Sequence, residues 1–217
     1  MVPCSRWTEL AECLNFHADL AHQAGAPTEF RLLNGGPPVR IGFTSNIAGK
    51  QQSPRSQQRQ LDKFKVKLKD APFGQTPLCR HLTEVIAQIT SVADELRQKG
   101  QLACLVIASD GEATDGKLTK VMKQLKDLPV WVVVRLCTND PVIIRYWNEI
   151  DQELELNMDV VDDYHGEGME IKKLNPWLTY GEPLHRIREF GVHIKELDLL
   201  DEQECQIAQV RQIAAVM

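Results

Sequence analysis

Leu102-Ala103-Cys104-Leu105-Val106-Ile107-Ala108 is an uninterrupted apolar run, and Ser109-Asp110-Gly111-Glu112 follows it directly. A run of this kind is typical of a strand buried on both faces, and therefore of a parallel sheet that helices cover. A second buried strand is predicted over residues 129–136, and a third, shorter one over residues 158–161. These runs together indicate a mostly parallel sheet.

Amphipathic segments lie before and between these strands. Apolar residues recur at helical spacing over residues 7–24, 81–99 and 140–154, and Gly25 and Gly100 follow the first two segments where a helix would stop. Strands that alternate with helices predict a doubly wound α/β fold. Further elements are expected as short strands over 29–33 and 39–44, and as helices over 61–68, 117–128, 183–190 and from Asp201 onward.

Composition sets limits on the class of protein. The chain has 217 residues, a net charge of −5 and 43% hydrophobic residues, which suits one large domain with a proper core. An acidic balance disfavours nucleic-acid binding, which requires a basic face. No apolar run is long enough to span a membrane. The six scattered cysteines are typical of free thiols in a reducing compartment, so we expect a cytoplasmic protein.

Two small polar loops are the candidate site, because ligands of doubly wound sheets bind outside the carboxyl ends of the strands. In the first loop, Asp110 follows the apolar run beside Ser109, Gly111 and Glu112. Its carboxylate and hydroxyl oxygens suit Mg²⁺, Ca²⁺ or Mn²⁺. The second is Gly74-Gln75-Thr76-Pro77-Leu78, in which Pro77 restricts Thr76 and presents its hydroxyl. Taken alone, each loop also has an ordinary interpretation. The first would be a simple turn after a strand, and the second would be the start of a helix.

Together and in this order, the two loops resemble the second and third parts of the metal-ion-dependent adhesion site of von Willebrand factor type A domains. The resemblance covers roughly residues 6–165. It implies a domain of that fold over residues 1–165, followed by a loop-and-helix extension over 166–217 that packs on the same domain. It also implies that Thr76 and Asp110 help hold Mg²⁺, or alternatively Ca²⁺ or Mn²⁺. The supporting loop residues would be Gly74, Ser109, Gly111 and Glu112, and an acidic side chain of a partner protein would complete the site.

One part of the family pattern is missing. The first metal motif, Asp-x-Ser-x-Ser, follows the family's first strand and would lie just before the helix that starts near Arg6, but residues 1–5 leave no room for either. We therefore expect a partial metal site of weakened affinity, because such sites depend on ligand number and charge. The absent strand would be central in the sheet. Either the chain is N-terminally incomplete, which we favour, or residues 30–33 pair with 105–108 and close the gap.

The leading interpretation is a non-enzymatic protein-binding module with a degenerate metal site. One alternative is a metal-dependent hydrolase or phosphoryl-transfer enzyme that uses Asp110, although no paired base or phosphate-binding lysine accompanies that motif in the sequence. Another alternative is a purely structural domain whose metal site no longer binds metal. The acidic residues over 159–170 either extend the cation site or form a solvated loop and helix start. Trp177 and Tyr180 either mark a partner surface or anchor the tail to the core.

Overall fold

The computed structural model describes residues 5–45, 51–138, 140–154, 156–192 and 194–216. The chain divides into two compact units, Met1–Pro77 and Leu78–Met217, and each unit has a sheet of its own. Within the described parts, no helix combines the length and the apolar character needed to cross a membrane.

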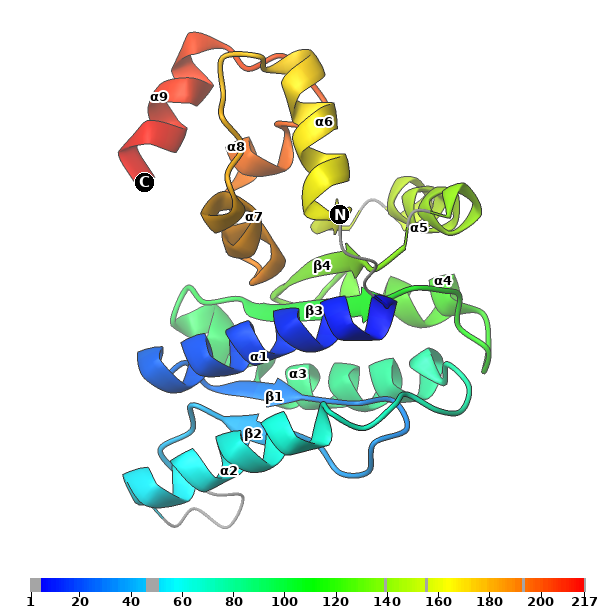
Figure 1. Ribbon diagram of the computed structural model, residues 1–217, viewed down its shortest axis with the longest axis vertical. Coiled ribbons are helices and arrows are strands. Elements are labelled where there is room, and N and C mark those ends of the chain that lie inside the picture. Colours follow the sequence, from blue (N-terminus) through cyan, green and yellow to red (C-terminus); the bar gives the residue numbers. More distant parts are fainter. Residues whose placement is uncertain (1–4, 46–50, 139, 155, 193, 217) are drawn as a thin grey trace. The chain divides into compact units, whose positions relative to one another are not determined.

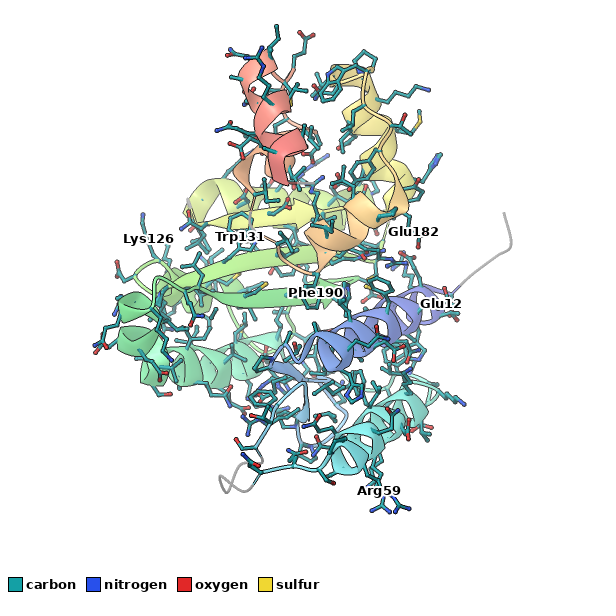
Figure 2. All side chains as sticks on the ribbon, turned by 90° about the vertical axis from the view of Figure 1, so that its left-hand side faces the viewer. Glu12, Arg59, Lys126, Trp131, Glu182 and Phe190 are labelled. Atoms are coloured by element: carbon teal, nitrogen blue, oxygen red, sulfur yellow. The ribbon has the colours of Figure 1, made fainter. Side chains whose placement is uncertain are left out.

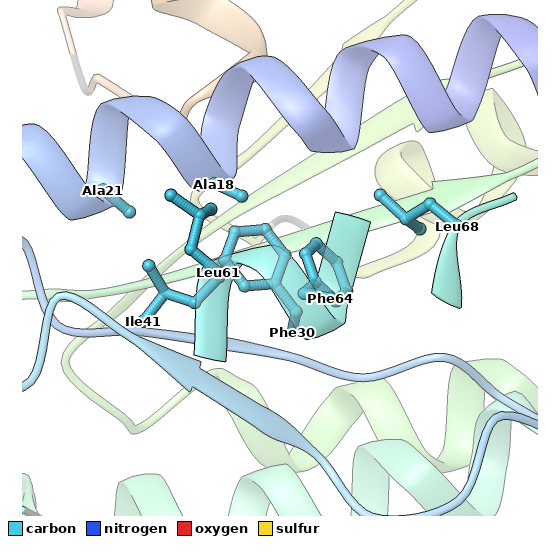
Figure 3. Packing of buried hydrophobic residues seen from close by; sticks show 7 residues of the cluster. All are labelled: Ala18, Ala21, Phe30, Ile41, Leu61, Phe64 and Leu68. Atoms are coloured by element: carbon cyan, nitrogen blue, oxygen red, sulfur yellow. The ribbon is translucent and has the colours of Figure 1, made fainter. Parts of the chain in front are cut away.

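The first unit is built from two helices and a small hairpin, whose bounds are α1 (Arg6–Ala24), β1 (Thr28–Phe30), β2 (Val39–Ile41) and α2 (Pro54–Lys67). Ser5 caps the start of helix α1, where its side chain accepts a hydrogen bond from the Thr8 N–H, and Gly25 caps the end with a positive φ of 61°. Strands β1 and β2 are antiparallel. These elements close over one core, shown in Figure 3, of Ala18, Ala21, Phe30, Ile41, Leu61, Phe64 and Leu68.

The second unit is an α/β unit with a three-stranded parallel sheet in the order β3-β4-β5. Figure 1 shows helix α3 on one side of this sheet and helix α7 on the other. The predicted α/β class and the predicted parallel pairing are therefore confirmed. The elements are α3 (Leu78–Gln98), β3 (Ala103–Ser109), α4 (Leu118–Met122), the 3-10 turn η1 (Lys123–Leu125), β4 (Val130–Leu136), α5 (Pro141–Leu154), β5 (Met158–Val161), α6 (Tyr164–Leu174), α7 (Glu182–Glu189), α8 (Lys195–Asp198) and α9 (Ile207–Val216).

Strands β3 and β4 differ in burial, although their sequences are similarly apolar. Every residue of β4 is buried, as predicted. The prediction that residues 102–108 are buried on both faces is wrong, since Leu102 is 50% and Val106 is 42% exposed. The physical reason is position: β3 lies at the edge of the three-stranded sheet, whereas β4 lies in its centre. An apolar edge strand without charged or proline residues is unusual, because it invites pairing with further strands.

The two sheets remain separate. Strand β1 pairs with β2, and β3 pairs with β4. Residues 31–33 lie outside β1. The hypothesis that residues 30–33 pair with 105–108 to close the gap is therefore not supported by the described residues. Met1–Cys4, part of the segment too short for the family's first strand, lie outside the described residues.

Helix α7 is seated on the sheet through its C-terminal end. The Cys104 thiol lies 3.6 Å from the carbonyl oxygen of Phe190, which is labelled in Figure 2. Gly191 has a φ of 81°, and a Cβ at this position would overlap the Cys104 sulfur. Cys104 is exposed as a whole residue, yet burial of its thiol raises the pKa to about 11. This close approach requires glycine at position 191.

The tail differs most from its prediction. Helix α6 was expected only as a helix start, and the last helix begins at Ile207 rather than at Asp201. Asn175 is fully buried, and its amide nitrogen donates to the carbonyl oxygens of Leu200 and Gln203 at 2.7 and 2.9 Å. Its side-chain oxygen accepts from the Cys205 N–H at 2.8 Å. The segment after Asp201 is thus shaped by a buried amide and not by helical periodicity.

Candidate functional site

The loop after β3 is a tight turn that presents two carboxylates. The Ser109 hydroxyl is buried and donates to the Gly111 carbonyl oxygen at 3.0 Å, while the Gly111 N–H lies 3.3 Å from the same hydroxyl. Asp110 and Glu112 on either side of this glycine are exposed. The predicted loop residues therefore do lie together at the carboxyl end of β3, with Ser109 in a structural role and the two acids facing solvent.

The far end of this loop is fixed to helix α3. The Asp115 carboxylate accepts hydrogen bonds from the N–H groups of Cys79 and Arg80 at 3.0 and 2.9 Å. Burial works against the Asp115 charge, but the two N–H groups hold its pKa below the usual value. Asp115 therefore caps the first turn of α3 from a distance in the sequence, where the helix dipole favours an anion. No local sequence pattern indicates this role, because the cap and its helix are far apart in the chain.

Replacing Asp115 with alanine is expected to lower the free energy of unfolding by about 1 kcal/mol, the usual cost of losing a helix cap. Because the Asp115 pKa is lower in the folded state, this contribution is present above the ordinary pKa of an aspartate and disappears as the pH falls through the folded value. Urea unfolding at pH 7 and pH 3 measures both effects. Asp94→Ala, on the same helix with a side chain 92% exposed, is the matched control and should change little.

Residues 74–77 of the second predicted loop belong to the first unit, whereas Leu78 is the first residue of α3. The loop backbone wraps around the Asn34 side chain, whose amide donates to the carbonyl oxygens of Phe73 and Gln75, both at 2.7 Å. Gly74 has a φ of 85°, and a Cβ there would come within 2.9 Å of Asn34. Thr76 is half-buried directly before Pro77. No local sequence pattern indicates that Asn34 organises this loop.

Thr76 and Asp110 thus fall in different units. The Asn34 side chain organises the loop that contains Thr76, and the second unit by itself brings together Ser109, Asp110, Gly111 and Glu112. The interpretation that Thr76 and Asp110 hold the same cation stays a prediction from the sequence.

The acidic residues over 159–170 take a form that neither sequence interpretation anticipated. The Arg188 guanidinium binds both carboxylate oxygens of Asp159, at 3.0 and 3.3 Å, and one of Glu167 at 2.6 Å. Asp201 lies 3.5 Å from the same guanidinium. We call these four residues the Arg188 cluster. Their side chains are only 1–14% exposed. The interpretation of the acidic residues over 159–170 as a solvated loop is therefore wrong for Asp159 and Glu167. Asp163, in contrast, does cap α6.

Charge is unbalanced in the Arg188 cluster, since three carboxylates share one guanidinium. Burial raises the pKa of Glu167 to about 7 despite the opposing charge of Arg188. Burial likewise raises the pKa of Asp201 to about 6. Burial also disfavours the charge of Arg188, but the surrounding carboxylates together raise its pKa well above the ordinary value. Arg188 therefore stays charged, while the cluster binds protons near neutral pH.

A second buried network lies beside it and joins β4 to α7. The Arg135 side chain donates to Glu189 at 2.8 Å, and Arg186 donates to the other oxygen of Glu189 at 2.7 Å. The ring nitrogen of His185 lies 3.1 Å from Glu189, and its other nitrogen lies 3.1 Å from the Tyr180 hydroxyl. Tyr180 is buried, as the anchor interpretation predicted, whereas Trp177 is 49% exposed.

A hollow of about 150 Å³ lies at the opposite end of the sheet from the Asp110 loop. It is lined by Leu125, Lys126, Leu128, Val130, Val132, Leu156 and Asn157. This volume is well below the roughly 300–1,000 Å³ of usual small-molecule sites. The hollow therefore offers no support for an enzyme with an organic substrate.

The chain matches no protein-family model, no curated protein and no solved structure.

Proposed function

We propose that this chain is a non-enzymatic protein-binding module whose Asp110 loop takes up a divalent cation, most suitably Mg²⁺. The observation that carries the proposal is the pair of exposed carboxylates, Asp110 and Glu112, at the carboxyl end of β3. Strand-end loops of parallel sheets are the usual place for ligands. Hard oxygen ligands on a short turn suit a small divalent ion that keeps several of its waters.

The neighbouring groups favour binding over catalysis. The Ser109 hydroxyl, the obvious nucleophile of the loop, is engaged with Gly111. The Asp115 carboxylate, which could act as a base, is engaged with the start of α3. Asp110 and Glu112 are exposed on a turn that is fixed at both ends. A cation bound there would keep open positions, and an acidic side chain of a partner protein would suit one of them.

The sequence resemblance to von Willebrand factor type A domains supports the same proposal and adds Thr76 as a further oxygen ligand. Two protein carboxylates and one hydroxyl form a weak site, so we expect millimolar rather than micromolar affinity. On this proposal, the partner's carboxylate would complete the site, and binding of the ion and binding of the partner would strengthen one another.

Calorimetric titration of Mg²⁺ and Mn²⁺ into the 217-residue chain tests the proposal. We expect saturable binding that Asp110→Asn weakens by about tenfold or more, because the site loses a charge. Asp127→Asn, which changes another exposed aspartate of the same unit, is the matched control and should leave the affinity unchanged. Thr76→Ala tests the added ligand. Titrations without heat for either ion would favour the purely structural alternative.

A further inference from the structure

The Arg188 cluster connects three elements of the tail to the sheet. Asp159 lies on β5, Glu167 on α6 and Arg188 on α7, while Asp201 follows α8. A single guanidinium therefore holds α6 and α7 against the central sheet of the second unit. Any change in the charge of this cluster acts on all of these contacts together.

The cluster is neutral only when two of its carboxyl groups are protonated. The bidentate contact with Asp159 pairs the single positive charge of Arg188 with one negative charge. Ionised Glu167 and Asp201 each add a negative charge that no second guanidinium of the cluster balances. Like charges that are buried a few ångströms apart repel strongly, because little water screens them.

The groups around the cluster do not remove this excess of negative charge. Tyr180 faces the cluster from the loop before α7, and Glu202 adds a further acid beside Asp201. Asp151 of α5 also lies close enough for the charges of Glu202 and Asp159 to help burial raise its pKa. The backbone N–H of Asp162 donates to Glu167 at 2.9 Å and partly offsets its burial.

The adjoining network does not supply the missing positive charge either. Arg135 and Arg186 both bind Glu189, and His185 faces Glu189 on one side and Tyr180 on the other. The positive charges of Arg135 and Arg186 are directed at Glu189, which lies next to Arg188 in the sequence. The groups around the cluster are thus mainly acidic or already paired.

We propose that the Arg188 cluster is a pH-sensitive clamp, which holds α6 and α7 against β5 in mildly acidic solution and loosens them as the pH rises through neutrality. The direction of this pH effect follows from the linkage between proton binding and folding. Glu167 and Asp201 have higher pKa values in the folded chain than in the unfolded chain. Their stabilising effect is complete below their ordinary values near pH 4, and it is lost as the pH rises through about 6 to 7.

Amide hydrogen exchange of the whole chain at pH 5.5 and pH 8.5 tests the clamp, with rates corrected for intrinsic exchange. We expect protection of α6 and α7 to be about tenfold or more lower at pH 8.5. Protection of α3, which takes no part in the cluster, should change far less. Equal protection of α6 and α7 at both values would overturn the proposal.

Two substitutions assign the effect to the cluster. Glu167→Gln and Asp201→Asn each remove one ionisable group, so each should reduce the pH response of α6 and α7 severalfold. Asp201→Asn is the milder change, because its contact with Arg188 is the longest of the three, and it decides the matter if Glu167→Gln does not fold. A response that persists unchanged in Asp201→Asn would place the titrating group elsewhere and overturn the clamp.

Discussion

Replacing Arg188 with methionine is expected to lower the free energy of unfolding of the second unit by about 3–5 kcal/mol at pH 7.5, which is the usual cost of removing one partner from a buried ion pair. Methionine retains most of the apolar volume but leaves three buried carboxylates without a counter-charge. Urea unfolding measures the loss. At pH 5.5 the deficit should be smaller, because Glu167 and Asp201 then hold protons.

Arg97→Met is the matched control for this change. Arg97 is also hydrogen-bonded to a carboxylate, that of Asp94, but the two side chains are 51% and 92% exposed. Exposed pairs of this kind contribute about 0–1 kcal/mol. A loss at Arg188 no larger than the loss at Arg97 would contradict the buried network.

Replacing Phe64 with alanine is expected to destabilise the first unit by about 3–5 kcal/mol, because it removes a large side chain and leaves a cavity. Phe64 is only 1% exposed, and its ring lies 4.7 Å from that of Phe30 between centroids. Amide exchange resolves the effect by unit, since α1 and α2 should lose protection.

Val66→Ala is the control on the same helix. Val66 is 62% exposed, so its truncation should change the free energy of unfolding by less than about 0.5 kcal/mol. Similar losses at positions 64 and 66 would mean that α2 does not pack through the face that Figure 3 shows.

Strong periodicity predicted much of this structure. The helical patterns gave α1 and α3 to within a few residues, because apolar spacing and a terminal glycine both mark a helix. The central strand β4 followed from its apolar run. For β3 the same kind of run was misleading, because composition does not distinguish an edge strand from a central one.

The polar contacts could not be predicted in the same way. Arg188 meets residues 29 and 21 positions earlier in the chain, and Asp115 caps a helix that starts 37 residues before it. Such contacts depend on the tertiary fold, and no local pattern records them. The candidate site was predicted in part: the sequence placed Asp110 at a strand end, whereas the anchoring of its loop by Ser109 and Asp115 emerged only from the structure.

Paramagnetic broadening by Mn²⁺ in amide NMR spectra of the full chain tests the central claim most directly, because it locates the ion as well as detecting it. We expect the amide signals of Asp110, Gly111 and Glu112 to broaden first at substoichiometric Mn²⁺, and this broadening to be lost in Asp110→Asn. Signals that stay sharp in this loop, or that broaden first at another acidic region of the chain, would contradict a cation site at the carboxyl end of β3.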